Sequence, residues 1–316
     1  MKRKPERGGR NTAATDGRNT AIPEGGRNTA AAPPLQWFPG HMAKTRRLMQ
    51  EHLSLVDGVV ELRDARAPES SANPELPKWT GEKPRILLLN KRDLAEADAT
   101  RAWAQRLRAQ GAHVLICDCK TGKGLQDFLP TVKKALAPVI EKNASKGMPG
   151  KPLRLMVVGI PNTGKSSFIN RMAKQSKAAA ADRPGVTRRL TWFSLGKING
   201  IPLELLDTPG VLWPKLEDQA AAQRLAFLGS IRDEVMDTEH LACLLLRFLQ
   251  EGYTDRLRER YTLTDTGGEP YNLLAAIGKG RGMLLPGGET DTLRAANALL
   301  DDFRGGKLGS ITLERA

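Results

Sequence analysis

The order of three short motifs constrains the fold of this chain more than any other feature. Residues 159–166 read Gly-Ile-Pro-Asn-Thr-Gly-Lys-Ser, which fits the phosphate-loop pattern G-x-x-x-x-G-K-[ST]. Residues 207–210 form a D-x-x-G segment, and residues 90–93 form an N-K-x-D segment. In most chains with all three motifs, N-K-x-D comes last, whereas here it comes first. We therefore expect one nucleotide site, assembled from two sequence halves in exchanged order.

The phosphate loop and the D-x-x-G segment carry the groups that bind phosphates and Mg²⁺. Glycines let main-chain N–H groups approach phosphate oxygens, and the start of the following helix favours an anion. Lys165 is predicted to reach the β and γ phosphates, Ser166 to ligate Mg²⁺, and Asp207 to hold the metal through water. Thr187 is the favoured residue to complete the metal shell, with Thr191 as its rival. The predicted nucleotide contacts in this half are Asn162, Thr163, Gly164, Lys165, Ser166, Ser167, Thr187 and Gly210.

The N-K-x-D segment is predicted to select guanine. The carboxylate of Asp93 can accept hydrogen bonds from guanine N1–H and the exocyclic amine, a donor pair that adenine lacks. Asn90 can brace the phosphate loop and reach the base, and the stem of Lys91 can lie across the ring. We expect a backbone N–H of the loop that contains Asp118 and Cys119 to meet guanine O6, although the usual Ser-Ala pair is absent there.

Hydrolysis of GTP needs an oriented water molecule, and the usual residue for this task is missing. Many proteins with these motifs place a glutamine directly after the D-x-x-G glycine, but here Val211 and Leu212 follow. Neither side chain can orient water, so unassisted hydrolysis should be slow. A catalytic group must then come from elsewhere in the chain, from a partner or from a bound cation. His41 is one candidate, and a structural or RNA-contacting role is the alternative for that histidine.

The charge balance indicates a polyanionic partner. The 316-residue chain has a formal net charge of +14, which favours nucleic acid, with a basic enzyme that has no such partner as the alternative. No segment approaches the roughly 18 uninterrupted apolar residues of a membrane span, and no apolar signal core stands at the N-terminus. The three cysteines fit neither a disulfide framework nor a four-ligand zinc site, so we expect a cytoplasmic protein.

Alternating strand and helix signals predict an α/β fold, a three-layer domain with a mostly parallel sheet. Ligands of such sheets bind beyond the carboxyl ends of the strands, where all three motifs fall. The strand signals lie at 56–62, 84–89, 112–117, 153–158, 190–195 and 201–206, and the helix signals lie at 43–53, 99–110, 125–141 and 165–172.

Three regions divide the chain. Residues 1–34 repeat Gly-Arg-Asn-Thr-Ala three times and have little apolar mass, which predicts a disordered low-complexity extension. Residues 35–214 are predicted to form the permuted nucleotide-binding domain, with a basic helix at its start. Beyond this region strand signals disappear, and helical spacing at 216–228, 238–251 and 290–303 predicts a helical, RNA-binding domain over residues 215–316.

At the level of motifs, residues 36–316 resemble the ribosome biogenesis GTPase A family of circularly permuted GTPases. The resemblance rests on the permuted order, on Trp-Phe-Pro-Gly-His-Met at 37–42, on Asp-Ala-Arg-Ala-Pro at 64–68, and on the phosphate-loop and D-x-x-G segments. Gly-Ser-Ile-Arg-Asp at 229–233 also resembles the family's linker to its C-terminal domain. The repeats at the N-terminus have no counterpart in that pattern.

The resemblance implies a GTPase that binds the precursor of the large ribosomal subunit through its rRNA and assists late assembly. It implies a catalytic role for His41 and a K⁺ site at Asn162, for which simple bracing of the loop is the alternative. We expect a monomer, no membrane contact and stimulation of turnover by ribosomal particles. Two other classes stay open: a regulatory GTPase that acts on a protein partner, and a GTP-dependent RNA-binding scaffold with negligible turnover.

Overall fold

The computed structural model describes residues 47, 49–175, 191–208, 218–231 and 236–316, all of which belong to one compact unit, Leu35–Ala316. Several predictions lie outside the described residues: the extension 1–34, most of the basic helix, and the site residues His41, Thr187 and Gly210. Only the end of the basic helix is described, as helical residues 47 and 49–53.

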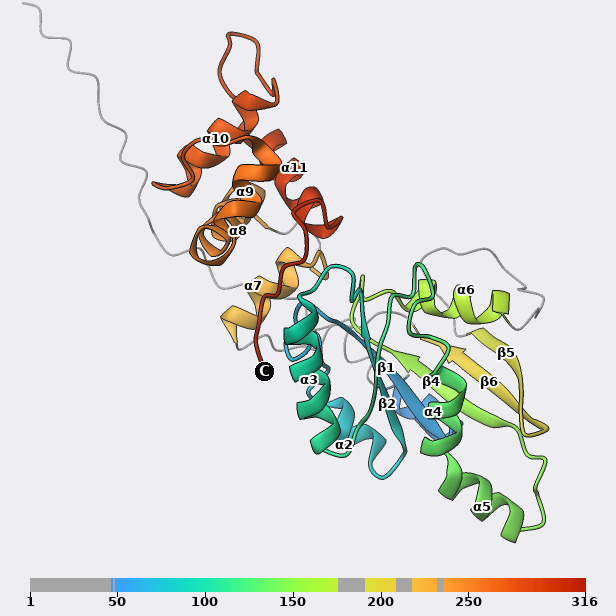
Figure 1. Cartoon of the computed structure of the whole chain (residues 1–316). Helices are drawn as coiled ribbons and strands as arrows, with labels where there is room; N and C mark the ends of the chain where they lie inside the picture. The colour runs from blue at the N-terminus through green and yellow to red at the C-terminus, as the bar shows by residue number, and fades with distance from the viewer. Residues whose placement is uncertain (1–46, 48, 176–190, 209–217, 232–235) are drawn as a thin grey trace, which may run out of the picture. The chain divides into compact units, whose positions relative to one another are not determined.

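A six-stranded sheet with the order β3-β2-β1-β4-β6-β5 forms the centre of the nucleotide-binding region (Figure 1). Neighbouring strands from β3 to β6 are parallel, and β5 is antiparallel to β6. The predicted α/β class with a mostly parallel sheet is therefore confirmed. The strands are β1 (Gly58–Asp64), β2 (Arg85–Asn90), β3 (His113–Ile116), β4 (Leu153–Val158), β5 (Thr191–Ile198) and β6 (Ile201–Asp207).

Helices cover both faces of the sheet, which explains why β2 and β4 are almost continuously apolar. On one face Val60 and Leu62 of β1 belong to a core cluster with Phe128 of α4 (Phe128–Ala135) and Phe168 of α6 (Lys165–Gln175). The two phenyl rings meet edge to face with centroids 5.1 Å apart. On the other face Leu87 and Leu89 of β2 pack against Trp103 and Leu107 of α3 (Ala97–Ala109). Leu76 of the short α2 (Leu76–Thr80) packs on the same side as Val59.

The strand register brings the sequence motifs to one edge of the sheet. Asp64 at the end of β1 pairs with Asn90 at the end of β2, and Leu89 pairs with Ile116 at the end of β3. On the other side of β1, the end of β4 lies next to the end of β6, where Val157 pairs with Asp207. Because these strands are parallel, all their carboxyl ends face the same edge.

The last third of the chain is helical, as predicted, and has its own apolar core. Its helices are α7 (Gln219–Phe227), α8 (Thr238–Gly252), α9 (Thr254–Tyr261), α10 (Pro270–Gly280) and α11 (Thr292–Arg304). Leu245 and Leu249 of α8, Leu274 of α10 and Leu299 of α11 are fully buried in this core. Two residues of the nucleotide-binding region, Ala67 and Ile160, belong to the same cluster. The domain division at residues 214 and 215 stays a prediction.

One predicted helix is wrong in its extent. The segment 125–141 is two helices, α4 and α5 (Ala137–Ser145), which meet at Leu136. Pro138 stands in the first turn of α5, where its missing N–H is harmless, whereas inside one long helix it would remove a hydrogen bond and clash with the preceding turn. Helix α5 also continues beyond the predicted end at residue 141, and the chain becomes irregular only after Ser145.

Candidate nucleotide site

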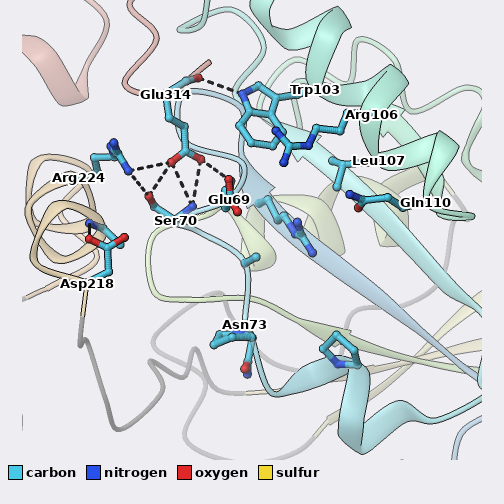
Figure 2. A pocket seen from close by; sticks show the side chains of 15 residues that line it. Glu69, Ser70, Asn73, Trp103, Arg106, Leu107, Gln110, Asp218, Arg224 and Glu314 are labelled. Carbon is cyan, nitrogen blue, oxygen red and sulfur yellow. Dashed lines mark hydrogen bonds and ion pairs between the residues drawn. The ribbon is translucent and has the colours of Figure 1, made fainter. Parts of the chain in front are cut away.

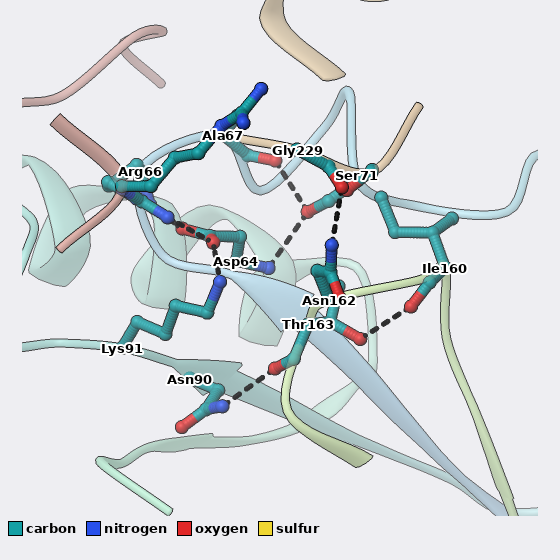
Figure 3. Close-up of polar contacts among 12 residues, drawn as sticks. Asp64, Arg66, Ala67, Ser71, Asn90, Lys91, Ile160, Asn162, Thr163 and Gly229 are labelled. Atoms are coloured by element: carbon teal, nitrogen blue, oxygen red, sulfur yellow. Dashed lines mark hydrogen bonds and ion pairs between the residues drawn. The ribbon is translucent and has the colours of Figure 1, made fainter. Parts of the chain in front are cut away.

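Asn90 joins the two exchanged halves of the chain (Figure 3). Its side-chain nitrogen donates to the main-chain oxygen of Thr163 in the phosphate loop, at 2.7 Å. Its side-chain oxygen accepts from the N–H of Cys119, at 2.8 Å. With 3% of its surface exposed, Asn90 fills both hydrogen-bonding roles in the interior. One amide therefore fixes the phosphate loop, the N-K-x-D segment and the loop after β3 relative to one another.

The glycines of the phosphate loop are needed for these close approaches. A Cβ at Gly164 would clash with the amide nitrogen of Asn90, and Gly164 has a φ of 98°, which side chains disfavour. A Cβ at Gly159 would lie 2.7 Å from the main-chain oxygen of Leu62 in β1. The hydroxyl of Thr163 donates to the oxygen of Ile160 at 2.9 Å, which closes the loop on itself. The loop is thus packed tightly against β1 and β2.

Lys165 points back over the loop that precedes it. Its ammonium donates to the main-chain oxygens of Gly159 and Ile160, each at 2.9 Å, and 8% of the residue is exposed. Burial lowers the pKa of Lys165 to about 8, while the negative charge of Asp207 opposes that shift. This electrostatic interaction indicates that Asp207 of the D-x-x-G segment lies close to Lys165 of the phosphate loop, although the two residues are 42 positions apart in the sequence.

The groups around Lys165 suit a divalent cation bound with phosphate. Ser166 and Ser167 begin α6 and are exposed, so the Ser166 hydroxyl is accessible to a metal. Asp207 supplies a carboxylate from the adjacent β6 and is 5% exposed. A hydroxyl and a carboxylate are oxygen ligands of the kind that Mg²⁺ prefers. Thr208, which the motif analysis did not single out, donates to the Val157 oxygen at 2.6 Å and fastens the D-x-x-G segment to β4.

At the base end, Asp93 is exposed and its carboxylate makes no hydrogen bond among the described residues. Lys91 has a left-handed backbone with φ of 60°, and its ammonium lies 2.9 Å from a carboxylate oxygen of Asp64. Asp64 also binds Arg66, which Figure 3 shows on the side away from the phosphate loop. In the sequence this Asp-Ala-Arg-Ala-Pro segment indicates only the family, and its position along the chain does not predict a contact with the N-K-x-D lysine.

The loop after β3 folds tightly on itself. Asp118 accepts from the hydroxyl of Thr121 and, at 2.8 Å, from the N–H of Lys120. Burial raises the pKa of the Asp118 carboxyl, but these hydrogen bonds outweigh it and hold the pKa below its usual value. The Cys119 N–H donates to the Asn90 side chain. The N–H groups of Cys119 and Lys120 therefore both have acceptors within the protein. Contact of this loop with guanine O6 stays a prediction.

Asn162 connects the phosphate loop with the segment that leads to α8. With a φ of 63°, Asn162 is, like Lys91, a non-glycine residue in the left-handed conformation. Its side-chain nitrogen donates to the Gly229 oxygen. Beside it, the Ser230 hydroxyl donates to the Pro161 oxygen at 2.9 Å. The bracing role of Asn162 is thus visible in the structure, and its side-chain oxygen is the atom that would face a cation.

A cleft of about 610 Å³ lies away from these motifs (Figure 2). Its walls come from the loop after β1, from α2 and α3, from α7 and from the C-terminal tail. In it the Glu314 carboxylate accepts from the N–H and the hydroxyl of Ser70 and pairs with Arg224 at 3.4 Å. Because Glu314 and Arg224 already pair with each other there, we expect the nucleotide at the motif edge and not in this cleft.

Comparison with known proteins fits this geometry. A family model described as 50S ribosome-binding GTPase matches residues 154–275. Ribosome biogenesis GTPase A from Bacillus licheniformis is 44% identical over 281 residues, which cover 89% of this chain and 98% of the relative. This chain belongs to the ribosome biogenesis GTPase A family. Mitochondrial ribosome-associated GTPase 1 of Mus musculus is 34% identical over 298 residues, covering 89% of this chain and 90% of the relative. The crystal structure of GNP-bound YlqF from T. maritima has a TM-score of 0.60 and 28% identity and covers 86% of this chain and 98% of that chain.

Membership in the ribosome biogenesis GTPase A family establishes the reaction class. The protein is a P-loop enzyme that hydrolyses GTP, and its family binds GTP and GDP, generally with Mg²⁺. The permuted motif order and the family predicted from the sequence are confirmed. Among the described residues, no helix is both long enough and apolar enough to cross a membrane, and no group of three or more His, Cys, Asp or Glu side chains is placed to hold a metal ion.

Proposed function

We propose that this GTPase hydrolyses GTP while it assists late assembly of the large ribosomal subunit through contacts with rRNA in the cytoplasm. The bridge from Asn90 to Thr163 and Cys119 carries the nucleotide part of the proposal, because it joins the base-reading segment to the phosphate loop. The family and the names of the relatives support a ribosomal partner. The net charge of +14 supports an RNA surface as the contact.

Within the site, each end of the nucleotide has its own set of residues. We assign the base to Asp93, Asn90 and Lys91, with the loop of Asp118 and Cys119 beside it. The phosphates are assigned to the loop residues 162–167, with Lys165 on the β and γ groups, and to Thr187 and Gly210. Mg²⁺ would be held by Ser166 and Thr187, and by Asp207 through water, where it would neutralise charge on the transferred phosphate.

The residue that orients the attacking water is proposed to be His41, and K⁺ at Asn162 is proposed to add positive charge near the γ-phosphate. Lys165 would supply a further positive charge there, because its ammonium lies over the phosphate loop. Since position 211 holds a valine, slow hydrolysis by the protein alone and faster hydrolysis on ribosomal particles are expected.

The contacts of the phosphate loop support control of the helical region by the nucleotide. Asn162 and Ser230 join the loop to residues 229 and 230, and α7 directly follows the segment after Asp207. We propose that GTP favours one arrangement of these segments, in which the helical region and the basic N-terminal helix hold rRNA. Hydrolysis would then release the protein, which acts as a monomer.

A sedimentation and turnover experiment tests the proposal. Binding to purified large-subunit precursors should require GTP or a nonhydrolysable analogue and should weaken steeply as salt is raised, because phosphate contacts release counterions. Phosphate release should rise when the particles are added. Binding without a rise in phosphate release would favour a GTP-dependent scaffold. Failure to bind any ribosomal particle would contradict the proposal and favour a protein partner.

A further inference from the structure

The carboxylate of Asp64 is the centre of a buried charge cluster beside Lys91 of the guanine-reading segment (Figure 3). One of its oxygens accepts from the Arg66 side chain at 2.9 Å and from the Arg66 N–H at 3.1 Å. The other accepts from Arg66 at 2.8 Å and lies 2.9 Å from the Lys91 ammonium. Only 1% of the Asp64 side chain is exposed. Although burial raises the pKa of this carboxyl, the two cations outweigh it and hold the pKa far below its usual value.

The backbone of Lys91 has an uncommon conformation. At a φ of 60°, a residue with a Cβ is strained, and the surrounding bonds must compensate. The Lys91 oxygen accepts from the Leu94 N–H at 2.9 Å, and the Asn90 oxygen accepts from the Ala65 N–H at 2.8 Å. These bonds fix the main chain on both sides of the lysine, and Asp64 fixes the far end of its side chain.

Arg66 anchors the carboxylate to the helical region. Its guanidinium donates to the Phe303 oxygen at 3.3 Å and lies 5.1 Å from the centroid of the Phe303 ring. The Arg66 oxygen accepts from the Leu313 N–H at 2.8 Å. Arg66 is itself 1% exposed, so the partner of Asp64 has little freedom to move. The carboxylate is thereby held from one side by Arg66 and holds Lys91 on the other.

We propose that Asp64 is a positioning residue for the guanine end of the site: through its ion pair it keeps the Lys91 side chain in one conformation beside Asp93. This role rests on the proposed assignment of the base to residues 90–93. It predicts a loss of affinity that is the same for GTP and GDP, because both carry the same base. The chemical step at the γ-phosphate, at the other end of the nucleotide, should change little.

Glu61 offers a matched control on the same strand. It is also 1% exposed and pairs with two arginines, Arg63 at 3.0 Å and Arg85 at 2.8 Å, but it makes no contact with Lys91 among the described residues. Glu61→Gln and Asp64→Asn each replace a buried carboxylate by an amide of the same shape. Both changes leave buried cations without a counter-charge and should lower the melting temperature. Only Asp64→Asn should change nucleotide affinity.

The test is a titration of the wild type and the variants with a fluorescent GDP, with competition by GTP. Asp64→Asn should weaken both nucleotides about tenfold, as expected for loss of a hydrogen bond to a charged group, with turnover at saturating GTP within about twofold of wild type. In a Lys91→Met background, Asp64→Asn should weaken binding by less than about twofold, because the partner through which it acts is gone. If Asp64→Asn does not fold, Asp64→Asn combined with Arg66→Met removes both buried charges and takes its place.

Three results would overturn the role of Asp64. These are unchanged affinity in the Asp64 variant, an equal loss in Glu61→Gln, and a loss that persists in full in the Lys91→Met background. A wild-type protein that binds ATP as well as it binds GDP would instead overturn the assignment of the base to residues 90–93. The two failures are therefore distinguishable.

Discussion

At the base end of the nucleotide site, side chains from neighbouring strands hold one another, whereas at the phosphate end a lysine is held by the carbonyls of its own loop. Asn90 and Asp64 are almost fully buried and have partners on separate segments. Lys165 donates to Gly159 and Ile160, which lie only six and five residues before it. The base end is thus a preformed framework, while the phosphate end must exchange a local partner for the ligand.

Because of this difference, the free-energy cost of binding a nucleotide has a different origin at each end of the site. A preformed base end loses little side-chain freedom when guanine binds. At the phosphate end, the Lys165 ammonium must give up two carbonyl hydrogen bonds and gain stronger ones to charged oxygens. Substitutions at the phosphate end should therefore affect turnover most, and substitutions at the base end should affect affinity for GTP and GDP alike.

The largest effect is expected from Lys165→Ala. Without its ammonium, charge on the transferred phosphate loses the cation of the phosphate loop, and turnover should fall on the order of a thousandfold. Phosphate release in the presence of ribosomal particles measures it. Lys174→Ala, an exposed lysine near the end of the same helix, is the control and should keep wild-type turnover. Retention of turnover by the Lys165 variant would remove this residue from the chemistry.

Asn90→Ala should weaken GTP and GDP by about a hundredfold, because it breaks two buried hydrogen bonds between segments that must form one site. The matched control is Asn143→Ala, which removes a buried asparagine from α5, outside the motifs. Calorimetric titration gives both affinities. If the two nucleotides lose affinity by clearly different factors, Asn90 does more than support the shared framework.

The pH dependence of GDP binding tests the phosphate end by itself. With a pKa of about 8, Lys165 in the nucleotide-free protein loses its charge as the pH rises from 7 to 9, so GDP affinity should fall about tenfold over this range. The same shift lowers the free energy of unfolding at neutral pH. Between pH 8 and pH 10.5 or so, the folded chain binds fewer protons than the unfolded chain. The free energy of unfolding should therefore rise with pH over this range. Lys165→Ala should lack both trends, and a wild-type affinity that is flat to pH 9 would exclude the shifted lysine.

The smallest effect is expected from Glu314→Gln in the C-terminal tail. The tail lies beside the base end, where the Ile311 N–H donates to the Leu94 oxygen, but it supplies no residue to the site. The Glu314 carboxylate forms an ion pair with Arg224 and accepts a hydrogen bond from the Ser70 hydroxyl. Loss of its charge should lower the free energy of unfolding by about 1 kcal/mol. Denaturant unfolding measures this change. A GDP affinity that also falls more than about twofold would extend the base-end framework to the tail.

Alternating strand and helix signals predicted the α/β class and the mostly parallel sheet because these signals are local. The apolar run at 153–158 predicts β4 with its observed bounds. The prediction for β1, 56–62, begins and ends two residues too early, because the charged residues Arg63 and Asp64 interrupt the apolar pattern at the end of the strand. The sequence did not predict helices α9 and α10, for two different reasons. The first has a single buried apolar residue, Leu257, and the second contains three glycine or proline residues that disfavour a helix in isolation.

The contacts between distant segments were beyond the reach of the sequence. Nothing in the spacing of Asp64 and Lys91 shows that β1 and β2 are neighbours with these two ends in register. Bracing of the phosphate loop by Asn90 was expected, but its second bond to Cys119 depends on the register of β3. Packing of the whole sheet decides such contacts, and a pattern along the chain does not contain that information.

The central claim is that two exchanged sequence halves form one guanine-nucleotide pocket, and the affinities of the wild type and Asp93→Asn for GTP and ATP test it most directly. We predict that the wild type binds GTP more tightly than ATP by a factor on the order of a thousand. Asp93→Asn should lose this preference through weaker GTP binding, with the melting temperature of the nucleotide-free protein unchanged. Equal binding of the two nucleotides by the wild type, or a preference for GTP that survives in Asp93→Asn, would contradict the claim.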